Sequence, residues 1–388
     1  MHLRQLSLVH FRNYEQQELR FDPGIVLFLG DNAQGKTNLL EAAFLLAAGR
    51  SERASGDADF IAWSQREETQ PFARVASTAV RASGEVSVEL TVVGREGARG
   101  LVASKRYKLN GVARRGFDVA GAITAVLFTT DDMELVKGAP SDRRRYLDVM
   151  LSQVDRGYNR ALSRYGKVVT QRNALLKRIR EGASRPDELA YWDEQLAADG
   201  SVLLSARAIA VAEVRGYAAE SYAGLSGERE ELDVTYEPRF NDRWPAERIE
   251  ATPAEELQPA LLERLASGRD RDIAAGMTLV GPHRDDLAMT LGGEPASSFA
   301  SRGQQRTAAL ALRLAESRLL RERTGERPVL LLDDVLSELD ASRRESVLSS
   351  LDADQVLITS ADPDRFASAA MRNAQTYRVA GGHAMQDR

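Results

Sequence analysis

The sequence predicts an α/β protein in which a mixed sheet and an antiparallel sheet form a head, with a mostly helical lobe inserted into it. Three observations carry this prediction. The apolar run 25–29 is typical of a strand covered on both faces, and a glycine-rich loop and a helical pattern follow it. Residues 72–111 alternate between apolar and polar side chains, as half-exposed antiparallel strands do. Stripes with helical spacing fill about 141–224, and an α/β pattern returns beyond about 275.

Each element has its own signal. Apolar runs predict strands at 2–9, 25–29, 329–332 and 356–359. Helical spacing predicts helices from Gly35 to Gly49, for some thirty residues after an N-cap at Ser141, over about 187–224 and over about 303–323. Glycine and asparagine pairs predict turns at 94–97, at Asn110–Gly111 and at Gly292–Gly293. The proline-rich passage 237–257 should be a connector.

Three segments follow from this order of elements. Residues 1–120 should form the N-terminal part of the head, 121–270 the inserted helical lobe, and 271–388 the C-terminal part of the head.

Composition narrows the class of protein. The 388 residues include no cysteine and four scattered histidines, so disulfides and thiolate metal sites are excluded and no histidine cluster suggests a metal. No stretch of 18 apolar residues occurs, so we expect no membrane span and a cytoplasmic protein. The net charge of −5 gives no general attraction to nucleic acid, so DNA contact would require a local basic patch.

The clearest motif is a phosphate-binding loop. Residues 30–37 match G-x-x-x-x-G-K-[ST] in full, between an expected strand and an expected helix. In such a loop backbone N–H groups surround the phosphates of ATP, the lysine ammonium reaches the β- and γ-phosphates, and the threonine hydroxyl binds Mg²⁺. The alternative is a chance match. The predicted nucleotide-binding residues are Gly30, Asp31, Asn32, Ala33, Gln34, Gly35, Lys36, Thr37 and Asn38.

Asp333 and Asp334 end the apolar strand pattern 329–332 and supply the carboxylates that such a loop requires. We expect Asp333 to hold Mg²⁺ with Thr37, and Asp334 to orient or deprotonate the attacking water. Lys36, Asp333 and Asp334 are therefore the predicted catalytic residues. Taken alone, an Asp pair after a strand is often only a helix cap.

A second free helix N-terminus is expected at residues 301–306. Ser301, Gly303 and Gln304 resemble the S-x-G-Q signature of ABC ATPases, although a simple Ser-capped helix is the alternative. Residues 337–340 (SELD) resemble the D-loop of the same superfamily. In ABC ATPases the signature of one subunit covers nucleotide held by the other, so the resemblance implies an ATP-dependent homodimer with two composite sites.

The strand pattern 356–359 departs from ABC transporters at its end. Ser360 and Ala361 follow it where a transporter has a switch histidine, and Asp334 stands where a glutamate is usual. Thr359 or Ser360 can replace the histidine only weakly. We therefore expect slow hydrolysis, below about 10 per second.

Five separated blocks resemble the RecF family from end to end of the chain. They are 8–14 (LVHFRNY), 32–42 (NAQGKTNLLEA), 128–148, 281–287 (GPHRDDL) and the signature with its two aspartates. One position departs: the family usually has Gly-Arg-Ser-His-Arg where this chain has Glu52 between Ser51 and Arg53.

The resemblance implies a function as well as a fold. It implies a head like that of SMC proteins, without their long coiled coil, and a weak, DNA-stimulated ATPase that acts as a switch. The expected partners are a second copy of the chain, gapped duplex DNA and single-strand to double-strand junctions, and the proteins RecO and RecR. Together they would help RecA to load on single strands coated by SSB, at the nucleoid.

Several basic residues are candidates for DNA contact. Cations at a helix start, as in Arg143-Arg144-Arg145, suggest an external anion, although nearby Asp131, Asp132, Glu134 and Asp142 offer local pairing. A basic stretch at 167–180 reads equally well as a solvated face. The candidates are Arg50, Arg53, Arg143, Arg144, Arg145, Lys177 and Arg178. Few aromatic residues accompany them, so we expect contact with a duplex backbone. His283 and Arg284 should shape a turn.

Two other classes remain open. A transporter-type or SMC-like structural ATPase head would act on a protein partner, but the helical insertion and missing histidine disfavour the first, and the lack of long heptads the second. A small-molecule kinase would leave the signature residues without a purpose.

Overall fold

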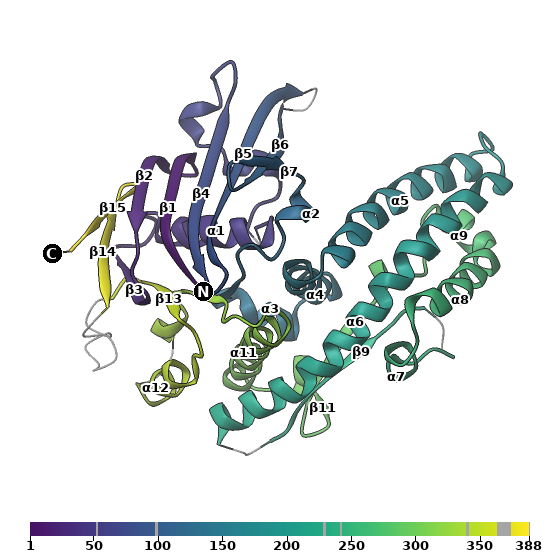
Figure 1. The fold of residues 1–388 in the computed structure, drawn as a ribbon. Helices are drawn as coiled ribbons and strands as arrows, with labels where there is room; N and C mark the ends of the chain where they lie inside the picture. Colours follow the sequence, from purple (N-terminus) through teal and green to yellow (C-terminus); the bar gives the residue numbers. More distant parts are fainter. Residues whose placement is uncertain are drawn as a thin grey trace. The chain divides into compact units, whose positions relative to one another are not determined.

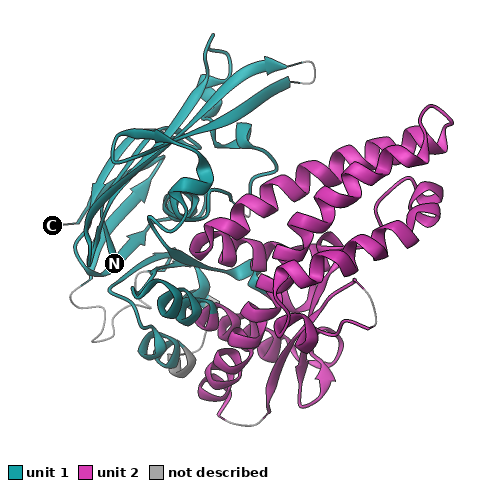
Figure 2. Ribbon diagram, turned by 45° about the vertical axis from the view of Figure 1, so that its right-hand side comes forward, with its two compact units in different colours: residues 1–132, 316–388 teal, residues 133–315 magenta. Residues whose placement is uncertain are grey.

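The computed structural model describes residues 1–51, 53–97, 100–227, 230–240, 243–338, 341–362 and 374–387. The chain forms two compact units: Met1–Asp132 together with Glu316–Arg388, and Met133–Ala315 (Figure 2). The first unit is called the head unit here, and the second the arm unit.

A six-stranded, mostly parallel sheet forms the centre of the head unit. Its strands lie in the order β15 (His383–Gln386), β14 (Gln375–Ala380), β3 (Gly24–Leu29), β13 (Gln355–Ser360), β12 (Val329–Asp333) and β8 (Ala125–Thr129). All except β15 run parallel. Their apolar runs are almost wholly buried, as in a sheet covered on both faces. The carboxyl ends of these strands therefore meet at one edge.

The second sheet of the head unit is antiparallel. Its strands lie in the order β2 (Tyr14–Arg20), β1 (His2–Phe11), β4 (Phe72–Arg81), β5 (Gly84–Gly97), β6 (Gly100–Leu109) and β7 (Val112–Arg114). Helix α1 (Lys36–Ala48) contacts β4 and β5 of this sheet and β8, β12 and β13 of the parallel sheet (Figure 1). Because the helix is covered by both sheets, its residues are buried nearly all round.

The remaining elements of the head unit are short. They are η1 (Asp57–Phe60), η2 (Trp63–Gln65), α2 (Gly116–Val119), η3 (Thr130–Asp132), η6 (Val335–Glu338) and α12 (Ala341–Ser350).

The arm unit is mostly helical. Its helices are α3 (Met133–Lys137), α4 (Pro140–Val154), α5 (Arg156–Arg180), η4 (Pro186–Glu188), α6 (Leu189–Ser226), α7 (Ala246–Glu250), α8 (Ala254–Ser267), α9 (Arg269–Ala275), η5 (Pro282–Arg284) and α10 (Ala296–Phe299). Helix α11 (Arg302–Thr324) begins in this unit and ends in the head unit. Helices α5 and α6 pack lengthwise in the arm unit (Figure 1).

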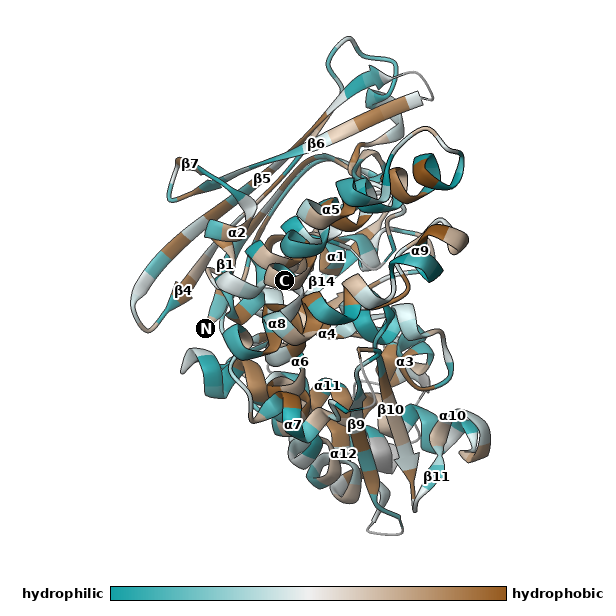
Figure 3. Ribbon diagram, turned by 90° about the vertical axis from the view of Figure 1, so that its right-hand side faces the viewer, coloured by the Kyte–Doolittle hydropathy of each residue, from teal (hydrophilic) through white to brown (hydrophobic). Residues whose placement is uncertain are grey.

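A three-stranded sheet completes the arm unit, in the order β11 (Glu294–Pro295), β10 (Asp286–Leu291) and β9 (Leu232–Glu237). Apolar side chains alternate along β9 and β10, so brown and pale segments follow one another there in Figure 3. The buried face includes Val234 and Leu287, and α6 packs on β9.

The α/β class, with one mixed and one antiparallel sheet, is confirmed, and four details of the elements are wrong. Ala139, not Ser141, is the N-cap of α4, with Pro140 in the first turn. The expected thirty-residue helix breaks at Asp155, whose carboxylate accepts a hydrogen bond from the Tyr158 N–H at 2.9 Å and so caps α5. Strand β5 runs to Gly97 instead of turning at 94–97, and the passage 237–257 contains α7 and the start of α8.

The limits of the two units lie at 132/133 and 315/316, whereas the expected segments change at 120/121 and 270/271. Strand pairing explains why the limits of the units differ from those of the expected segments. Strand β8 pairs with β12 and so belongs to the head unit, while β10 pairs with β9 and so belongs to the arm unit. No described helix has both the length and the apolar content that crossing a membrane requires.

Candidate functional site

The loop of residues 30–35 joins β3 to α1 and depends on glycine. Gly35 is the N-cap of α1 with φ +115°, and a Cβ there would lie 2.5 Å from Asn13 Nδ2. A Cβ on Gly30 would lie 2.2 Å from the carbonyl oxygen of Val379. Both distances are far shorter than real Cβ contacts, so only glycine fits. The loop thus brings its backbone to a helix N-terminus, where N–H groups attract anions.

The Lys36 ammonium lies within the curve of this loop. Its Nζ donates hydrogen bonds to the carbonyl oxygens of Gly30, at 2.6 Å, and of Asp31, at 2.8 Å. Burial lowers the pKa of Lys36, while the charges of Asp334, Asp333 and Asp31 act in the opposite direction. The loop therefore carries a cation at the place where the phosphates of a nucleotide would lie.

Thr37 and Asp333 meet although they are 296 positions apart. The Thr37 hydroxyl donates a hydrogen bond to Asp333 Oδ1 at 2.9 Å, and the Thr359 hydroxyl donates to the same oxygen at 2.7 Å. The parallel register sets Asp333 beside Thr359 at the edge of the sheet. Burial raises the pKa of Asp333, whereas these two hydrogen bonds and the charge of Arg53 lower it. Hydroxyl and carboxylate oxygens together suit Mg²⁺.

Asp334 is held in an unusual backbone conformation. Its φ of +55° is left-handed, and its N–H donates to Thr359 Oγ1 at 3.0 Å. The Asp334 Oδ1 atom is buried and has no hydrogen-bond partner among the residues that the structure describes. A buried oxygen of this kind normally has a partner. The site therefore offers an acceptor for a water molecule or for a ligand's proton beside Asp333.

Thr359 and Ser360 differ in what they contact. Thr359 touches both aspartates, as described above. The Ser360 hydroxyl instead donates to the carbonyl oxygen of Asp362 at 3.2 Å and accepts from its N–H at 3.1 Å. Of the two residues expected at the switch position, Thr359 is the one that reaches the site.

Two residues that support the loop were not singled out from the sequence. Glu41 of α1 is buried and binds the Arg12 guanidinium with both oxygens, at 2.7 and 2.8 Å. Asn13, which follows Arg12 in the chain, donates to the Gln34 carbonyl oxygen at 3.0 Å and accepts from Asn38 Nδ2 at 2.8 Å. In the sequence, Asn13 and Glu41 lie within the family-like blocks 8–14 and 32–42, and Glu41 is also an acid in an otherwise apolar helix.

A hollow of about 570 Å³ lies beside the loop. Its lining includes Asn13, Asn38, Arg53, Trp63 and Arg66. Trp63 is 78% exposed, and the Arg66 guanidinium lies 3.7 Å from the centre of its ring. Amide groups, cations and an aromatic face are groups that bind a nucleoside.

The expected signature lies in the arm unit, whereas the phosphate loop and both aspartates lie in the head unit. Ser301 and Gln304 form a reciprocal cap at the start of α11: the Ser301 N–H donates to Gln304 Oε1 at 2.7 Å, and the Gln304 N–H to Ser301 Oγ at 3.3 Å. The Gln304 side-chain amide also donates to Glu230 at 2.6 and 2.8 Å.

The residues expected to form a D-loop are described only in part. Ser337 lies in η6 and its N–H donates to the Asp334 carbonyl oxygen at 3.2 Å. Leu339 and Asp340, and also Glu52, lie outside the described residues.

Two of the three arginines at the start of α4, Arg143 and Arg144, bind partners within the arm unit. Arg143 is buried; it binds Asp286 with two nitrogens at 2.7 and 2.9 Å, and the Gly138 carbonyl oxygen at 2.8 Å. Arg144 donates to the Asp285 carbonyl oxygen at 2.7 Å. Arg145 also has an interaction partner. Asp286 is thus the partner of Arg143, in place of the carboxylates expected nearby, because β10 packs on α4.

The other basic candidates are spread over both units. Arg178 donates to the Ser184 hydroxyl, and Lys177 beside it is exposed. Arg50 is half-buried near Tyr107, while Arg53 is exposed and its charge acts on Asp333. Among these seven candidates, Arg53 is therefore the one beside the expected active site.

His283 shapes a turn, as expected. It lies in η5, where Nε2–H donates to the Thr278 carbonyl oxygen at 3.0 Å and Nδ1 accepts from the Tyr165 hydroxyl at 2.8 Å. Burial lowers the pKa of His283 to about 4. Both ring nitrogens are used within the fold, which leaves neither free for a metal.

Comparison with known proteins gives consistent matches over the whole chain. The family model described as RecF/RecN/SMC N terminal domain matches residues 2–384. The DNA replication and repair protein RecF of Roseiflexus castenholzii is 43% identical over 396 residues, which cover 99% of both chains. RecF of Herpetosiphon aurantiacus is 44% identical over 377 residues, which cover 94% of both chains.

Solved structures show the same similarity. The recombination mediator protein RecF with ATP, described as part of the RecFOR pathway, has a TM-score of 0.84 at 32% identity and covers 100% of this chain and 97% of that chain. An Smc head domain from Pyrococcus furiosus has a TM-score of 0.51 at 16% identity, over 100% of this chain and 96% of the other, and so shows a similarity of fold alone.

Proposed function

We propose, from the premise that this chain belongs to the RecF family, that it is an ATP-binding and ATP-hydrolysing DNA repair protein, two copies of which close on DNA when ATP binds. One observation carries the proposal above the others. The Thr37 hydroxyl and the Asp333 carboxylate lie 2.9 Å apart directly behind the loop that holds the Lys36 ammonium. This arrangement matches the metal and phosphate binding that nucleotide hydrolysis requires.

Different residues of the chain would bind the phosphates, hold the metal and orient the attacking water. The loop N–H groups and Lys36 would bind the phosphates of ATP, and Thr37 with Asp333 would hold Mg²⁺. When bound, Mg²⁺ neutralises the charge that develops on the phosphate oxygens. The buried, unpaired Oδ1 of Asp334 would accept a hydrogen bond from the attacking water and orient it. Thr359 binds both aspartates where a histidine is absent, which supports slow turnover.

Two copies of the chain would complete each site. The signature residues occur once per chain, and they lie in a different compact unit from the phosphate loop. Ser301 and Gly303, at the free start of α11, would cover nucleotide bound by the partner copy. Binding of ATP would then supply the contact that holds the dimer together, and hydrolysis would release it.

The wider role follows from the relatives. Relatives of this chain are named DNA replication and repair proteins, and one is described as a recombination mediator in the RecFOR pathway. We therefore assign this chain to gapped duplex DNA and single-strand to double-strand junctions at the nucleoid, in the cytoplasm. There it would act with RecO and RecR in loading RecA on strands coated by SSB, and DNA would stimulate its ATPase.

Sedimentation of the full chain tests the proposal. Wild type, Lys36→Met and Ser301→Arg are compared with ATP and with ADP, each with and without fluorescent gapped duplex. ATP alone should convert wild type to a dimer that retains the DNA, and both variants should stay monomeric. A wild-type chain that remains monomeric with ATP and ignores DNA would contradict the proposal and favour an ATPase head that acts on a protein partner.

A further inference from the structure

The outer face of the antiparallel sheet carries three arginines without partners. On this face, the face away from α1, Arg74 of β4, Arg95 of β5 and Arg106 of β6 are exposed. None of them takes part in an ion pair, or in a hydrogen bond through its side chain, within the described part of the chain. By contrast, the exposed arginines Arg4 and Arg20 of the same sheet pair with Glu85 and Glu18.

Strand register places Arg95 and Arg106 at one hollow, and Arg74 in the same row as Arg106. Cross-strand pairing aligns Arg74, Thr91 and Arg106 in one row, and Phe72, Val93 and Ser104 in the next. Arg95 lies two residues beyond Val93 on β5, hence on the same face and on the other side of the second row. The row of Arg74, Thr91 and Arg106 and the row of Arg95 and Val102 therefore flank a central row whose floor is Phe72 and Val93.

This hollow has a volume of about 840 Å³. Arg95 and Arg106 line it together with groups that form hydrogen bonds, namely Thr69, Gln70, Thr91 and Ser104. Arg74 and Arg106 are two strands apart, which is about 10 Å at the usual strand spacing. Two guanidinium groups at that separation, with the Thr91 hydroxyl between them, can bind phosphates of one polyanion.

The acidic residues of this face leave a positive balance. Glu89 pairs with Lys108 at 2.8 Å, so its charge is already used. Glu96, at the rim of the hollow, is the remaining carboxylate that lines it. Three arginines against one carboxylate give a local excess of positive charge on a chain whose net charge is −5. Such an excess is the electrostatic footprint of a nucleic-acid backbone.

We infer that this face, defined by Arg74, Arg95 and Arg106, binds the phosphate backbone of duplex DNA. The inference rests on the proposed function, which it makes specific by naming the surface. Duplex is favoured over single strand because the aromatic ring in the hollow, Phe72, is half-buried in the floor and offers no exposed platform for stacking bases. Contacts of this kind carry no base readout, so binding should be independent of sequence.

The experiment measures the affinity of the full chain for a fluorescent 30-base-pair duplex over a range of salt, in the presence of ATP. It compares wild type with the triple variant Arg74→Ala, Arg95→Ala and Arg106→Ala. The matched control replaces Arg4, Arg20 and Arg378, which are exposed and paired with acids, and so removes the same number of positive charges. Unfolding temperature and ATP affinity of each variant report on folding.

The triple variant should bind duplex at least about 30-fold more weakly, and the slope of log K against log salt should become shallower by about 2 to 3, because each phosphate contact contributes about 0.9 to that slope. The control should stay within about 3-fold of wild type. Arg106→Lys, which keeps the charge, should bind nearly as wild type, and Arg106→Glu more weakly than Arg106→Ala.

Each other outcome has one meaning. A folded triple variant that binds duplex as the control does overturns the inference and leaves the proposed function standing. A wild-type chain that binds ATP but no DNA, with any nucleotide, overturns the proposed function itself. If the triple variant loses affinity for a 60-nucleotide single strand while keeping its affinity for duplex, the assignment to duplex is wrong.

Discussion

At the scale of single residues, the site depends on how burial and hydrogen bonds act on the two aspartates, Asp333 and Asp334. Asp333 is half-buried, and its burial raises its pKa, whereas the hydrogen bonds that two threonine hydroxyls donate to its Oδ1 stabilise the charged form. Asp334 keeps one oxygen unpaired and its backbone in the left-handed region. Conformations of that kind persist where the surrounding structure imposes them and are common at functional sites.

Replacing Asp334 by asparagine should separate hydrolysis from binding. Asparagine has the same shape and tolerates a positive φ, but it is a poor base. We expect ATP turnover to fall by about 100-fold or more while ATP affinity changes less than about 3-fold. Release of phosphate measures ATP turnover, and binding of a fluorescent ATP analogue measures affinity. Asp352→Asn, the same change at an exposed aspartate that pairs with Arg321 and Arg327, serves as control. Equal turnover in wild type and Asp334→Asn would refute the role of this carboxylate.

His283 should make stability depend on pH. Its pKa is lowered to about 4 by burial, from 6.5 in an unfolded chain, so the unfolded state binds more protons between these values. The free energy of unfolding therefore keeps its full His283 contribution above pH 6.5 and loses it as the pH falls toward 4. The loss is roughly 3 kcal/mol in all, at about 1.36 kcal/mol per unit of pKa difference. Urea unfolding at several pH values should show a shallower dependence for His283→Gln than for wild type. Parallel curves would argue against this role.

At the scale of elements, two hairpins brace the phosphate loop. The Gly381 N–H donates to Gln34 Oε1 at 2.7 Å and the Gly382 N–H to the Gln34 carbonyl oxygen at 3.1 Å, so the turn between β14 and β15 holds the loop. The turn between β1 and β2 holds the same residue through Asn13. Elements from the two ends of the chain therefore set the shape of the loop that follows β3.

Gly382→Ala tests this bracing. A Cβ at Gly382 would lie 2.2 Å from the Asn13 carbonyl oxygen, so the turn must move away from the loop. We expect ATP affinity to fall by at least about 5-fold, since about 1 kcal/mol is lost with a hydrogen bond. Gly84→Ala is the matched control: its φ of +112° is equally unfavourable, but no atom lies within 4 Å of the added Cβ. Calorimetric titration with ATP distinguishes the two, and equal affinities would mean that the turn does not position the loop.

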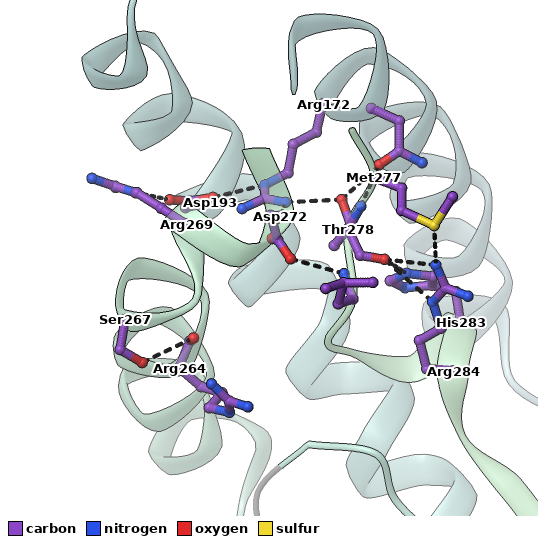
Figure 4. Close-up of polar contacts among 12 residues, drawn as sticks. Arg172, Asp193, Arg264, Ser267, Arg269, Asp272, Met277, Thr278, His283 and Arg284 are labelled. Carbon is purple, nitrogen blue, oxygen red and sulfur yellow. Dashed lines mark hydrogen bonds and ion pairs between the residues drawn. The ribbon is translucent and has the colours of Figure 1, made fainter. Parts of the chain in front are cut away.

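A buried ionic network joins three helices of the arm unit (Figure 4). Arg172 of α5 is fully buried and binds Asp193 of α6 at 2.8 Å and Asp272 of α9 at 2.6 Å. It also donates to the Thr278 hydroxyl at 2.9 Å, and Arg269 binds the other oxygen of Asp193 at 2.7 Å. The basic stretch expected to be a solvated face thus contains a residue that belongs to the core.

Removing Arg172 should destabilise the protein strongly. Arg172→Met leaves the buried Asp272 without its arginine and the buried Asp193 with Arg269 alone, which costs about 3 to 5 kcal/mol. Arg178→Ala, an exposed position on the same helix, should cost less than about 0.5 kcal/mol. Urea unfolding measures both. Similar values for the two variants would show that the network contributes little to stability.

At the scale of the whole molecule, the chain separates its nucleotide-binding motifs between two compact units. The phosphate loop and the aspartates belong to the head unit, and the signature residues open α11 in the arm unit. A composite site formed by two copies would use both units of each copy. We therefore expect the chain to have little hydrolytic activity as a monomer, because each copy would hold only half of every composite site.

Mixing two inactive variants tests the composite site directly. Lys36→Met disrupts the phosphate loop, and Ser301→Arg disrupts the signature. Because each site takes its loop from one copy and its signature from the other, a mixed dimer holds one intact site and one that carries both changes. Since neither variant should dimerise by itself, the dimers of an equimolar mixture are mixed ones with one intact site of two, so ATPase activity should return to at most about half of the wild-type value. Either variant alone should stay inactive. A mixture without activity would mean that the two motifs do not act across a dimer.

The sequence alone determined the class of fold and predicted the chemistry of the site, because both rest on local patterns. The loop 30–37, the Asp pair at 333 and 334, and the strand and helix periodicities are each written in a short stretch of chain. The buried strands β3, β12 and β13 were predictable for the same reason: an apolar run between turn signals needs no knowledge of its neighbours.

Only the tertiary structure decided which residues meet across long separations. The sequence favours a solvated face for Arg172, and an external anion or a nearby carboxylate for Arg143. Their partners Asp272 and Asp286 lie 100 and 143 positions away. The hydrogen bond from the Gly381 N–H to Gln34 joins residues that are 347 positions apart. The unpaired arginines of the outer sheet face are likewise invisible in sequence, because strand register, not local spacing, brings Arg74 and Arg106 into one row.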